Sequence, residues 1–429
     1  MLINCLKTSS LSLEKPFGKA IHILNGLVLN YPWLGVMEEA SAASAHERDR
    51  ALVYRMVAEG SAQSRPEIGR LSGLRSSTVS RAVAELVASR LLVETAGGGR
   101  GRGRPAGVLL ANPRAIGCSV IHIVSQSLAG ALIDLKGEVI LRRTRPIPRD
   151  ADNAAMGEAM RELAATLRAA MPHGMVHAGT AVSLSGLIDL RQSRWLMASR
   201  WPAMRDLDVE ALLGPAAAPV RIWRNLDAEL RARVAREPDR FASGTLLLHW
   251  GWGIGLAHAV DGEPLSPAGG PFGEIGHWRF SVLEGRRCGC GNTGCLETGA
   301  ALWSLLPLLR RLWPQLGEDE ETLADALAAC DLLRVPEMDA AVVILARALA
   351  NACRLLFPRR ILVSGPLVAN AALFARLDGL FRQEGAMAGF AMPPLSIVRA
   401  SAAMEIEGAA SALLGRALRE ALSDEARPR

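Results

Sequence analysis

One histidine and three cysteines lie close together in the chain and have the chemistry of a metal site. His277, Cys288, Cys290 and Cys295 fall in the segment GHWRFSVLEGRRCGCGNTGC. Three thiolates and one imidazole complete a tetrahedral zinc site without an open position, so the metal would be structural and would activate no water. A redox dithiol is the alternative, but Cys-Gly-Cys lacks the two-residue spacer usual in thiol oxidoreductases. We therefore predict a structural Zn²⁺ held by these four residues.

An arginine-rich segment near the N-terminus is the second feature with evident chemistry. Residues 51–114 contain ten arginines, four glutamates and neither lysine nor aspartate, so their net charge of +6 equals that of the whole chain of 429 residues. A basic module on a neutral body is typical of nucleic-acid binding. The segment therefore indicates a nucleic acid as partner.

Three helices are predicted at the start of this basic segment. Apolar residues recur with helical spacing in ERDRALVYRMVAEG, and SRPEIGRLSGL predicts a short second helix with Pro66 in its first turn and Gly73 at its end. The third helix, in RSSTVSRAVAELVASRLL, is expected to be capped by Ser76 or Ser77. Its apolar stripe consists of Val79, Val83, Leu86 and Val87.

The short connection SGLRSS between the second and third helices is what a helix-turn-helix motif requires. In that motif the second helix enters the major groove of DNA, and its N-terminal polar side chains meet bases and phosphates. The residues predicted to contact DNA from this helix are Arg75, Ser76, Ser77, Thr78, Ser80 and Arg81. A helical hairpin with an ordinary solvated face is the alternative.

A wing is predicted after the third helix, because LLVETAGGGRGRGRPAGVLLANP has the pattern of two strands joined by a glycine-rich tip. The tip carries Arg100, Arg102 and Arg104, and an extended Arg-Gly-Arg-Pro can lie in a narrow minor groove. A disordered basic linker is the alternative. Helices and wing together favour binding of double-stranded DNA.

Composition limits the other possibilities. Hydrophobic residues make up 50% of the chain and charged residues 21%, as is ordinary for a globular protein. The remaining cysteines are scattered, which excludes a disulfide framework and fits a reducing, cytoplasmic setting. The uncharged stretch from Ser243 to Val260 predicts a buried strand plus loop rather than a membrane span. The N-terminal residues superficially resemble a signal peptide, but their interrupted apolar part favours an upstream extension or a mis-called start.

The residues around the cysteine cluster resemble the ROK family of repressors, open reading frames and sugar kinases. GEIGH followed by CGCGNTGCLE is similar to the family signature, and the similarity extends to AVSLSGLID, GWGIG and RRILVSGPL. The resemblance covers nearly all of the chain after about residue 46. It implies an α/β protein with an actin-like, ribonuclease-H-like ATPase fold of two lobes and a sugar between them. The N-terminal helices and wing look like the winged helix-turn-helix domain of the family's regulators.

The resemblance also implies which residues bind the sugar. The family uses an Asn-Asp pair, the Glu and His of its Gly-Glu-x-Gly-His motif, and the Glu after the last Cys. The pair falls in WRNLDAELRARVAREP, where Asp227 matches the Asp and Leu226 replaces the Asn, while a one-residue shift would keep Asn225 and lose the Asp. The sugar-binding residues implied in this chain are Asp227, Glu274, His277 and Glu297.

Two phosphate-binding loops of the family's kinases are altered here. The first reads Asp-x-Gly-x-Thr in the kinases, but HIVSQS in this chain has neither a carboxylate to organise Mg²⁺ nor a glycine to admit phosphate. In the second loop, GWGIG, Trp252 stands in place of a threonine, and Ser364-Gly365-Pro366 replaces glycines near the adenine position. These changes imply that ATP is not bound and that the chain is not an enzyme. Asp227 would be the base if it were a kinase.

We therefore predict a DNA-binding transcriptional regulator, most often a repressor in this family, of carbohydrate-related genes. It would act as a homodimer or homotetramer on a palindromic operator, under the control of a sugar or sugar phosphate. An active ATP-dependent sugar kinase with a DNA-binding module is the alternative, and a regulator that responds to a protein partner is a third. The expected divisions are an N-terminal extension (1–46), the winged helix-turn-helix domain (47–113), a first lobe (114–243, with the C-terminal helix 404–421), a second lobe with the zinc loop (244–403) and a tail (422–429).

Overall fold

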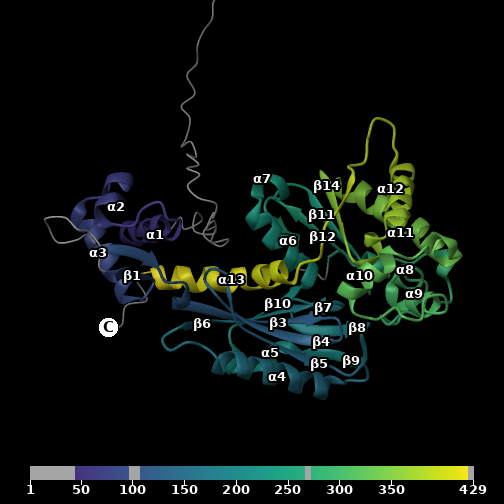
Figure 1. The fold of residues 1–429 in the computed structure, drawn as a ribbon, viewed down its shortest axis with the longest axis horizontal. Helices are drawn as coiled ribbons and strands as arrows, with labels where there is room; N and C mark the ends of the chain where they lie inside the picture. Colours follow the sequence, from purple (N-terminus) through teal and green to yellow (C-terminus); the bar gives the residue numbers. More distant parts are fainter. Residues whose placement is uncertain (1–43, 96–106, 266–271, 424–429) are drawn as a thin grey trace, which may run out of the picture.

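The computed structural model describes residues 44–95, 107–265 and 272–423. It places them in a small N-terminal module and two larger lobes (Figure 1). Nearly all of the predicted N-terminal extension and most of the predicted tail lie outside the described residues. Within the described ranges, no helix combines the length and apolarity needed to cross a membrane.

The N-terminal module consists of three helices followed by a two-stranded hairpin. Its elements are α1 (Ala45–Ala58), α2 (Arg65–Ser72), α3 (Ser76–Ala88), β1 (Leu92–Thr95) and β2 (Val108–Ala111). A capping box of Ser44 and Glu47 starts α1, two residues before the predicted domain limit. Gly73 ends α2 with a φ of +72°, the left-handed conformation that favours glycine, so the chain turns sharply into α3.

The first lobe is built on a five-stranded sheet in the order β10-β6-β3-β4-β5. Strands β3, β4 and β5 pair antiparallel, whereas β6 pairs in parallel with β3 and with β10. Helices α4 and α13 cover the sheet, and the run of buried residues along β3 follows from this two-sided cover. The bounds are β3 (Ile116–Val124), β4 (Ser127–Asp134), β5 (Val139–Pro146), α4 (Asn153–Ala169), β6 (Val176–Leu184), β10 (Val220–Arg224) and α13 (Ala402–Leu422).

A small three-stranded sheet, β7-β8-β9, extends the first lobe. Its core contains Trp195 and Trp201, which are fully buried and meet edge to face with ring centroids 6.0 Å apart. The tight turn between β8 and β9 holds Arg200. The elements are β7 (Leu187–Asp189), β8 (Arg194–Ala198), β9 (Trp201–Asp208) and α5 (Val209–Leu213).

The second lobe repeats the topology of the first. Its sheet has the order β13-β12-β11-β14-β15, again with three antiparallel strands followed by two parallel ones. This duplication is the predicted actin-like, ribonuclease-H-like arrangement. The strands are β11 (Thr245–Trp250), β12 (Ile254–Val260), β13 (Glu263–Pro264), β14 (Arg360–Ser364) and β15 (Leu395–Ile397). The uncharged stretch therefore forms two strands and the loop between them.

Helices pack on both faces of the second sheet. The first group is α8 (Glu297–Ala300), α9 (Leu302–Leu309), α10 (Glu320–Ala328), α11 (Pro336–Leu356) and α12 (Ala371–Gly385), and the second is α6 (Asn225–Arg236) and α7 (Pro238–Phe241). Leu226 and Leu230 of α6 pack against β11, β12 and β14, although the predicted division assigns α6 to the first lobe. Because α6 also packs against α13, it lies between the two lobes, and the predicted limit at residue 243 stays a prediction.

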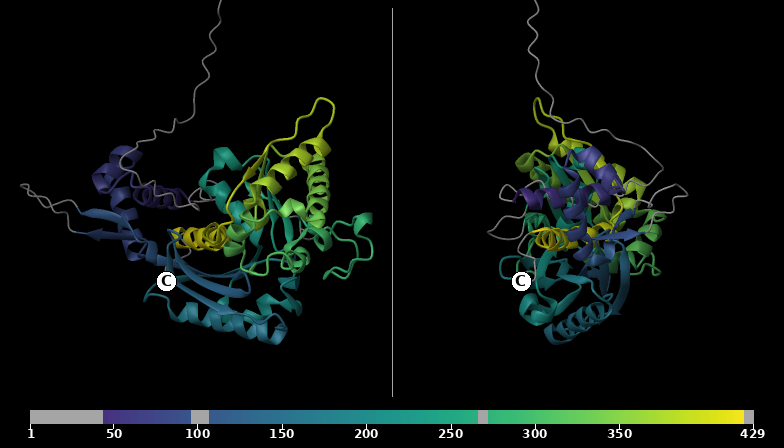
Figure 2. Two further views of the ribbon diagram at one scale, coloured as in Figure 1. Left: turned by 45° about the vertical axis from the view of Figure 1, so that its right-hand side comes forward. Right: turned by 90° about the vertical axis from the view of Figure 1, so that its left-hand side faces the viewer.

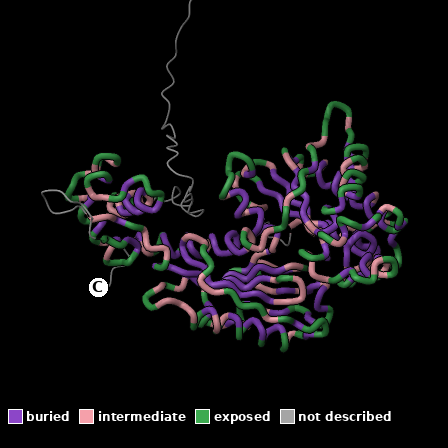
Figure 3. Tube along the Cα trace, in the orientation of Figure 1, coloured by how far each residue is buried: buried purple, intermediate pink, exposed green. Residues whose placement is uncertain are grey.

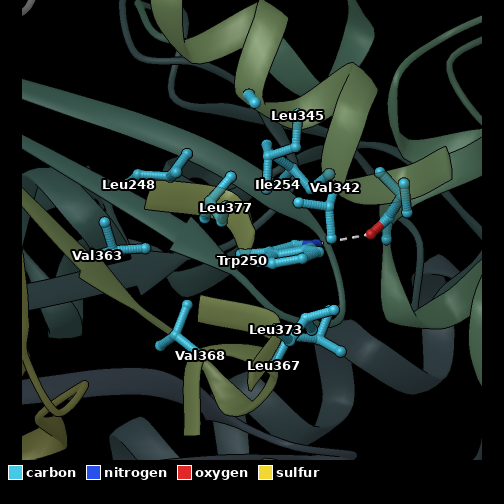
Figure 4. Close-up of a cluster of buried hydrophobic side chains, with 14 of the residues drawn as sticks. Leu248, Trp250, Ile254, Val342, Leu345, Val363, Leu367, Val368, Leu373 and Leu377 are labelled. Atoms are coloured by element: carbon cyan, nitrogen blue, oxygen red, sulfur yellow. Dashed lines mark hydrogen bonds between the residues drawn. The ribbon is translucent and has the colours of Figure 1, made fainter. Parts of the chain in front are cut away.

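Burial follows this layering, with the strands and inward helix faces buried and the outer helix faces exposed (Figure 3). In the second lobe, Trp250 lies among leucines, valines and isoleucines from β11, β14, α11 and α12 (Figure 4). Its indole N–H donates to the carbonyl of Ala300 at 2.8 Å. This anchor fixes the end of β11, and with it the GWGIG loop that follows.

Helix α13 connects the region between the lobes with the N-terminal module (Figures 1 and 2). It packs against β3, β6 and α6, and its far end contacts α1. Arg50 of α1 donates to the carbonyl of Ser423 at 2.8 Å. One hydrophobic cluster runs without a break from Val53 and Ile68 in the module to Ile406 and Leu418 in α13, so module and lobe share a core.

Candidate functional sites

The first turns of α3 form an exposed polar surface on the N-terminal module. Arg75, Ser76, Ser77, Ser80 and Arg81 are exposed and Thr78 is half-buried, while Val79, Val83 and Leu86 face the core. Within the described residues, neither Arg75 nor Arg81 is paired with a carboxylate. Two cations and several hydroxyls are thus displayed on one helix end.

The start of α3 differs from the prediction. Arg75 is the residue in extended conformation before the helix, and it provides no side-chain cap, so neither Ser76 nor Ser77 is the capping residue. That prediction was wrong because the backbone turns helical one residue earlier, at Ser76. The two hydroxyls therefore lie in the first helical turn.

The predicted wing is present as the antiparallel pair β1 and β2, with Leu92 opposite Ala111 and Thr95 opposite Val108. Its tip, with Arg100, Arg102 and Arg104, lies outside the described residues. Arg65 of α2 pairs with Glu94 of β1, which fixes the hairpin against the helices. The described end of the hairpin therefore lies next to the start of α2.

The predicted metal ligands are brought together. The ligand atoms of His277, Cys288, Cys290 and Cys295 all lie within 4.8 Å of one another. Cys288 Sγ is 3.6 Å from His277 Nδ1, and Cys290 Sγ is 3.7 Å from Cys295 Sγ. For a tetrahedral ion with bonds of about 2.3 Å to sulfur and about 2.0 Å to nitrogen, the expected separations are about 3.5 Å and about 3.8 Å. The four residues therefore fit a zinc ion.

Tight turns make this convergence possible. Gly291 and Gly294 have φ values of +95° and +76°, which side chains rarely adopt. Isolated bridges join Arg279 to Cys295 and Arg287 to Thr293, so the loop folds back on itself. His277 closes the short 3-10 turn η4 (Ile275–His277), which places its ring at the edge of the cluster.

His277 faces the cysteines with one ring nitrogen and the predicted sugar site with the other. Its Nδ1 is next to Cys288, and its Nε2 is 4.0 Å from Glu274 Oε2. Glu274 precedes η4, and burial raises the pKa of its carboxyl against the opposing charge of Arg224. One imidazole can therefore serve both a metal and a polar ligand in the cleft.

Asp227 lies at the N-terminal end of α6, where only 2% of its surface is exposed. Burial raises the pKa of its carboxyl to about 6, and the nearby Arg224 only partly opposes this effect. The neighbouring Leu226 packs into the core beneath the second sheet. The register of the Asn-Asp pair that uses Asp227 stays a prediction.

Glu297 is buried at the start of α8 and is already hydrogen-bonded. Its Oε1 accepts the backbone N–H of Ile254 at 2.8 Å, and its Oε2 accepts the indole N–H of Trp303 at 3.1 Å. A Cβ on Gly253 would lie 2.8 Å from the same Oε1, so a larger residue there would push the Glu297 carboxylate away from Ile254. Glu297 therefore fixes the GWGIG loop, and each of its oxygens keeps a lone pair for a further donor.

Arg224, which sequence reasoning missed, joins the predicted sugar ligands. Only 5% of it is exposed at the end of β10. Its Nε is 3.3 Å from Glu274 Oε1, its Nη1 is 3.5 Å from Asp227, and its Nη2 donates to the carbonyl of Leu256 at 3.1 Å. The sequence did hold one indication of this contact: Arg224 lies three residues before Asp227, a spacing at which opposite charges can pair over one helical turn. Any ligand of these two carboxylates must share them with a guanidinium.

The two lobes repeat a ribonuclease-H-like topology, the second lobe holds a closed Cys₃His cluster, and a winged helix precedes both lobes. These features define the class of the protein: a kinase-type fold joined to a module of the kind that binds DNA. The ROK family model matches residues 119–417, and the chain belongs to the ROK family.

Similarity to known proteins extends over most of the chain. It is 25% identical to the DNA-binding transcriptional repressor Mlc of Escherichia coli over 77% of this chain and 84% of Mlc. The crystal structure of a ROK family transcriptional regulator, a homologue of the E. coli protein, aligns with a TM-score of 0.61 at 23% identity, covering 88% of this chain and 97% of that one. A ROK family glucokinase from Streptomyces griseus, in complex with glucose and AMPPNP, aligns with a TM-score of 0.54 at 17% identity over 68% and 98% of the two chains. These likenesses confirm the predicted fold.

Proposed function

We propose that this chain is a transcriptional repressor that binds double-stranded DNA through its winged helix and is controlled by a sugar or sugar derivative bound between its lobes. The similarity to Mlc, a DNA-binding repressor, supports the first part. The fold shared with a glucokinase that holds glucose supports the second. Such a regulator would act in the cytoplasm, because bacterial DNA lies there.

The observation that carries this proposal is the shared core between α13 and the module. Near its start, α13 carries Glu405, which accepts a hydrogen bond from Ser183 of the first sheet at 2.7 Å. At its end, Ser423 accepts from Arg50. A shift of the lobes would therefore move the module as a unit, and ligand control requires only that the two arrangements bind the ligand differently.

The exposed end of α3 would supply the DNA contacts, with Arg75 and Arg81 toward phosphates or base edges and the serines and Thr78 between them. Arg100, Arg102 and Arg104 of the wing tip would reach the minor groove. A homodimer or homotetramer would place two modules on a palindromic operator, because half-site spacing follows the spacing of the modules.

The cleft would bind the sugar through Asp227, Glu274, His277 and Glu297. Carboxylates accept hydroxyl hydrogens, and the buried position of Asp227 and Glu297 keeps water from competing. Zn²⁺ would be held by His277 and the three cysteines, and its chemistry there is structural, since it fixes the loop. Because Arg224 already engages Asp227 and Glu274, a sugar carrying an acidic group is one natural candidate for the effector.

We further propose that the chain does not use ATP. The β3–β4 turn offers Ser125 and Gln126 where a kinase has its acidic and glycine residues, and Trp252, only 6% exposed, occupies the second loop. The test is ADP release with ATP, Mg²⁺ and a panel of sugars. We expect none, and sustained turnover that Asp227→Asn abolishes would establish the kinase alternative instead.

The DNA-binding role is tested by fluorescence anisotropy with labelled duplexes at several salt concentrations. Arg75→Ala with Arg81→Ala should weaken binding. The slope of log affinity against log salt concentration should become shallower by about 1 for each phosphate that the protein no longer neutralises. Arg102→Ala with Arg104→Ala should do the same through the wing. Arg311→Ala, an exposed arginine of the second lobe, is the matched control and should change neither quantity. Unchanged affinity and slope in both double variants would refute the assignment.

A further inference from the structure

An acidic segment of the second lobe reaches across to the first. Glu318, Asp319 and Glu320 precede and begin α10, which packs within the second lobe against the segment after β14. All three are half-buried, whereas the next residue, Glu321, is exposed. Burying a carboxylate costs free energy unless it is paired with a cation or a hydrogen-bond donor. The groups that pair with these three carboxylates come from several segments of the fold.

The first partner is the turn between β3 and β4 of the first lobe. Ser125 Oγ donates to Asp319 Oδ2 at 2.8 Å, and Gln126 Nε2 donates to Glu318 Oε2 at 2.9 Å. This turn is the place where the kinases of the family carry their first phosphate-binding loop. Two hydrogen bonds to carboxylates therefore cross from one lobe to the other at this point.

The second partner is Arg200, in the turn between β8 and β9 of the first lobe. Only 6% of it is exposed, and its Nη2 donates to Glu320 Oε1 at 3.2 Å. Its guanidinium carbon lies 4.3 Å from the centre of the Trp252 ring, a cation–π contact with the second lobe. Arg149 of the first lobe is 3.9 Å from Glu318. Three separate segments of the first lobe thus meet the acidic segment.

Glu320 also binds the GWGIG loop of its own lobe. Its Oε1 accepts the backbone N–H of Trp252 at 2.8 Å, and its Oε2 is 3.3 Å from His249 Nε2. On its other side, His249 Nδ1 is 3.2 Å from Ser364 Oγ. A Cβ on Gly251 would lie 3.0 Å from Glu320 Oε2 and 2.4 Å from His249 Nε2, so the glycine leaves room for this pair.

Glu320, His249 and Arg200 shift one another's pKa values through their charges. Burial alone would raise the pKa of Glu320, but the hydrogen bond and charge of His249 and the charge of Arg200 lower it to about 2. For His249, burial acts to lower the pKa, and the hydrogen bond and charge of Glu320 outweigh it, so the pKa is raised. The buried Arg200 and the half-buried His249 cannot be moved away from Glu320 without leaving a charge unpaired.

We propose that residues 318–320 form a latch that holds the two lobes together, because they bond to the β3–β4 turn and the β8–β9 turn of the first lobe and to the GWGIG loop of the second. The latch bonds directly to the β3–β4 turn and the GWGIG loop, and His249 connects Glu320 to Ser364. Separation of the lobes therefore requires these contacts to break. The proposal is independent of DNA binding and of the sugar effector.

The test compares Glu320→Gln with Glu321→Gln by hydrogen–deuterium exchange and small-angle X-ray scattering of the full chain without DNA or sugar. The glutamine keeps the shape of the side chain but removes its charge from Arg200 and His249. In Glu320→Gln we expect faster exchange in the β3–β4 turn, the β8–β9 turn and the GWGIG loop together, and a larger radius of gyration. Glu321→Gln, an exposed neighbour, should match the wild type. Wild-type exchange in both turns of the first lobe in Glu320→Gln would overturn the proposal.

A second pair of variants keeps the proposal testable if Glu320→Gln does not fold. Gln126→Glu lies in a partly exposed turn and sets a carboxylate against Glu318, so it should open the lobes as Glu320→Gln does. Adding Glu318→Gln exchanges donor and acceptor across the lobes and should move exchange and radius back toward wild type. Failure of Gln126→Glu to open the lobes, or of the added Glu318→Gln to close them, would contradict the latch. Asp319 is left unchanged in all variants because it caps α10 through Thr322.

Discussion

Replacing Asp227 by asparagine should alter how the stability of this chain depends on pH. Asp227 is a carboxyl whose pKa burial raises from 3.8 to about 6 in the folded chain. A group with a folded pKa above its unfolded value binds a proton more readily in the folded state. Its contribution to stability is therefore lost as pH rises through the interval from 3.8 to about 6, and does not change further above it. Asparagine has nearly the same size but does not titrate, so it makes no such pH-dependent contribution to stability.

The size of the effect follows from these two pKa values. One pKa unit corresponds to about 1.4 kcal/mol, so the buried charge costs about 3 kcal/mol at pH 8 and about 1.6 kcal/mol at pH 5, where part of the cost is avoided by protonation. The difference between the two conditions, about 1.4 kcal/mol, belongs to Asp227 alone. It corresponds to about a tenfold change in the unfolding equilibrium.

Urea unfolding of the zinc-loaded chain at pH 5 and pH 8 measures this difference. The free energy of unfolding of Asp227→Asn minus that of wild type should be about 1.4 kcal/mol larger at pH 8 than at pH 5, because only the wild type loses stability between the two. Asp150→Asn, at an exposed position of the first lobe, is the control and should follow the wild type at both values. Equal pH dependence of Asp227→Asn and wild type would refute the reasoning, and would mean that Arg224 holds the carboxyl ionised throughout.

Three further predictions concern the metal, the loop and the link to the module. Cys290→Ser should lower bound zinc well below one ion per chain and speed hydrogen exchange across residues 277–297, as measured by elemental analysis and mass spectrometry; full zinc content would contradict the ligand set. Gly253→Ala should weaken the fold by placing a methyl group against Glu297 Oε1, and an unchanged melting temperature would exclude that close approach. Arg50→Ala should loosen the contact with Ser423 and speed exchange at the end of α13, without changing the zinc content; unaltered exchange there would remove this contact from the link between module and lobe.

Features encoded by local spacing could be predicted from the sequence. The three helices and the wing strands follow from apolar periodicity and turn residues, and the metal cluster follows because its four ligands lie in one short segment. The capping of α3 was predicted wrongly, since Arg-Ser-Ser offers several starting points and the backbone conformation of Arg75 decides among them.

Contacts between distant segments could not be predicted. The spacing of Arg224 and Asp227 is visible in the sequence, but the contacts of Arg224 with Glu274 and the carbonyl of Leu256, which lie far along the chain, are not. The stretch Glu-Asp-Glu-Glu at the start of α10 is typical of a solvated helix N-terminus. Its partner Gln126 is 192 residues away from Glu318. No periodicity or motif signals such a pairing, which depends on the closure of the lobes.

The glycines of GWGIG are a second case in which the sequence could not predict the contacts. Their spacing after a strand indicates room for a phosphate, and Trp252 argues against one. The structure fills the room above Gly251 and Gly253 with Glu320, His249 and Glu297 of the same chain. The glycines are thus explained by internal carboxylates and an imidazole.

The central claim, that this ROK protein is a DNA-binding regulator, is tested most directly by selecting duplexes from a random library with the purified full chain. The predicted result is enrichment of a palindromic sequence with two half-sites, whose binding is abolished in the variant that carries Arg75→Ala and Arg81→Ala and retained in Arg311→Ala. Enrichment of no sequence, or equal recovery of DNA by all three proteins, would contradict the claim.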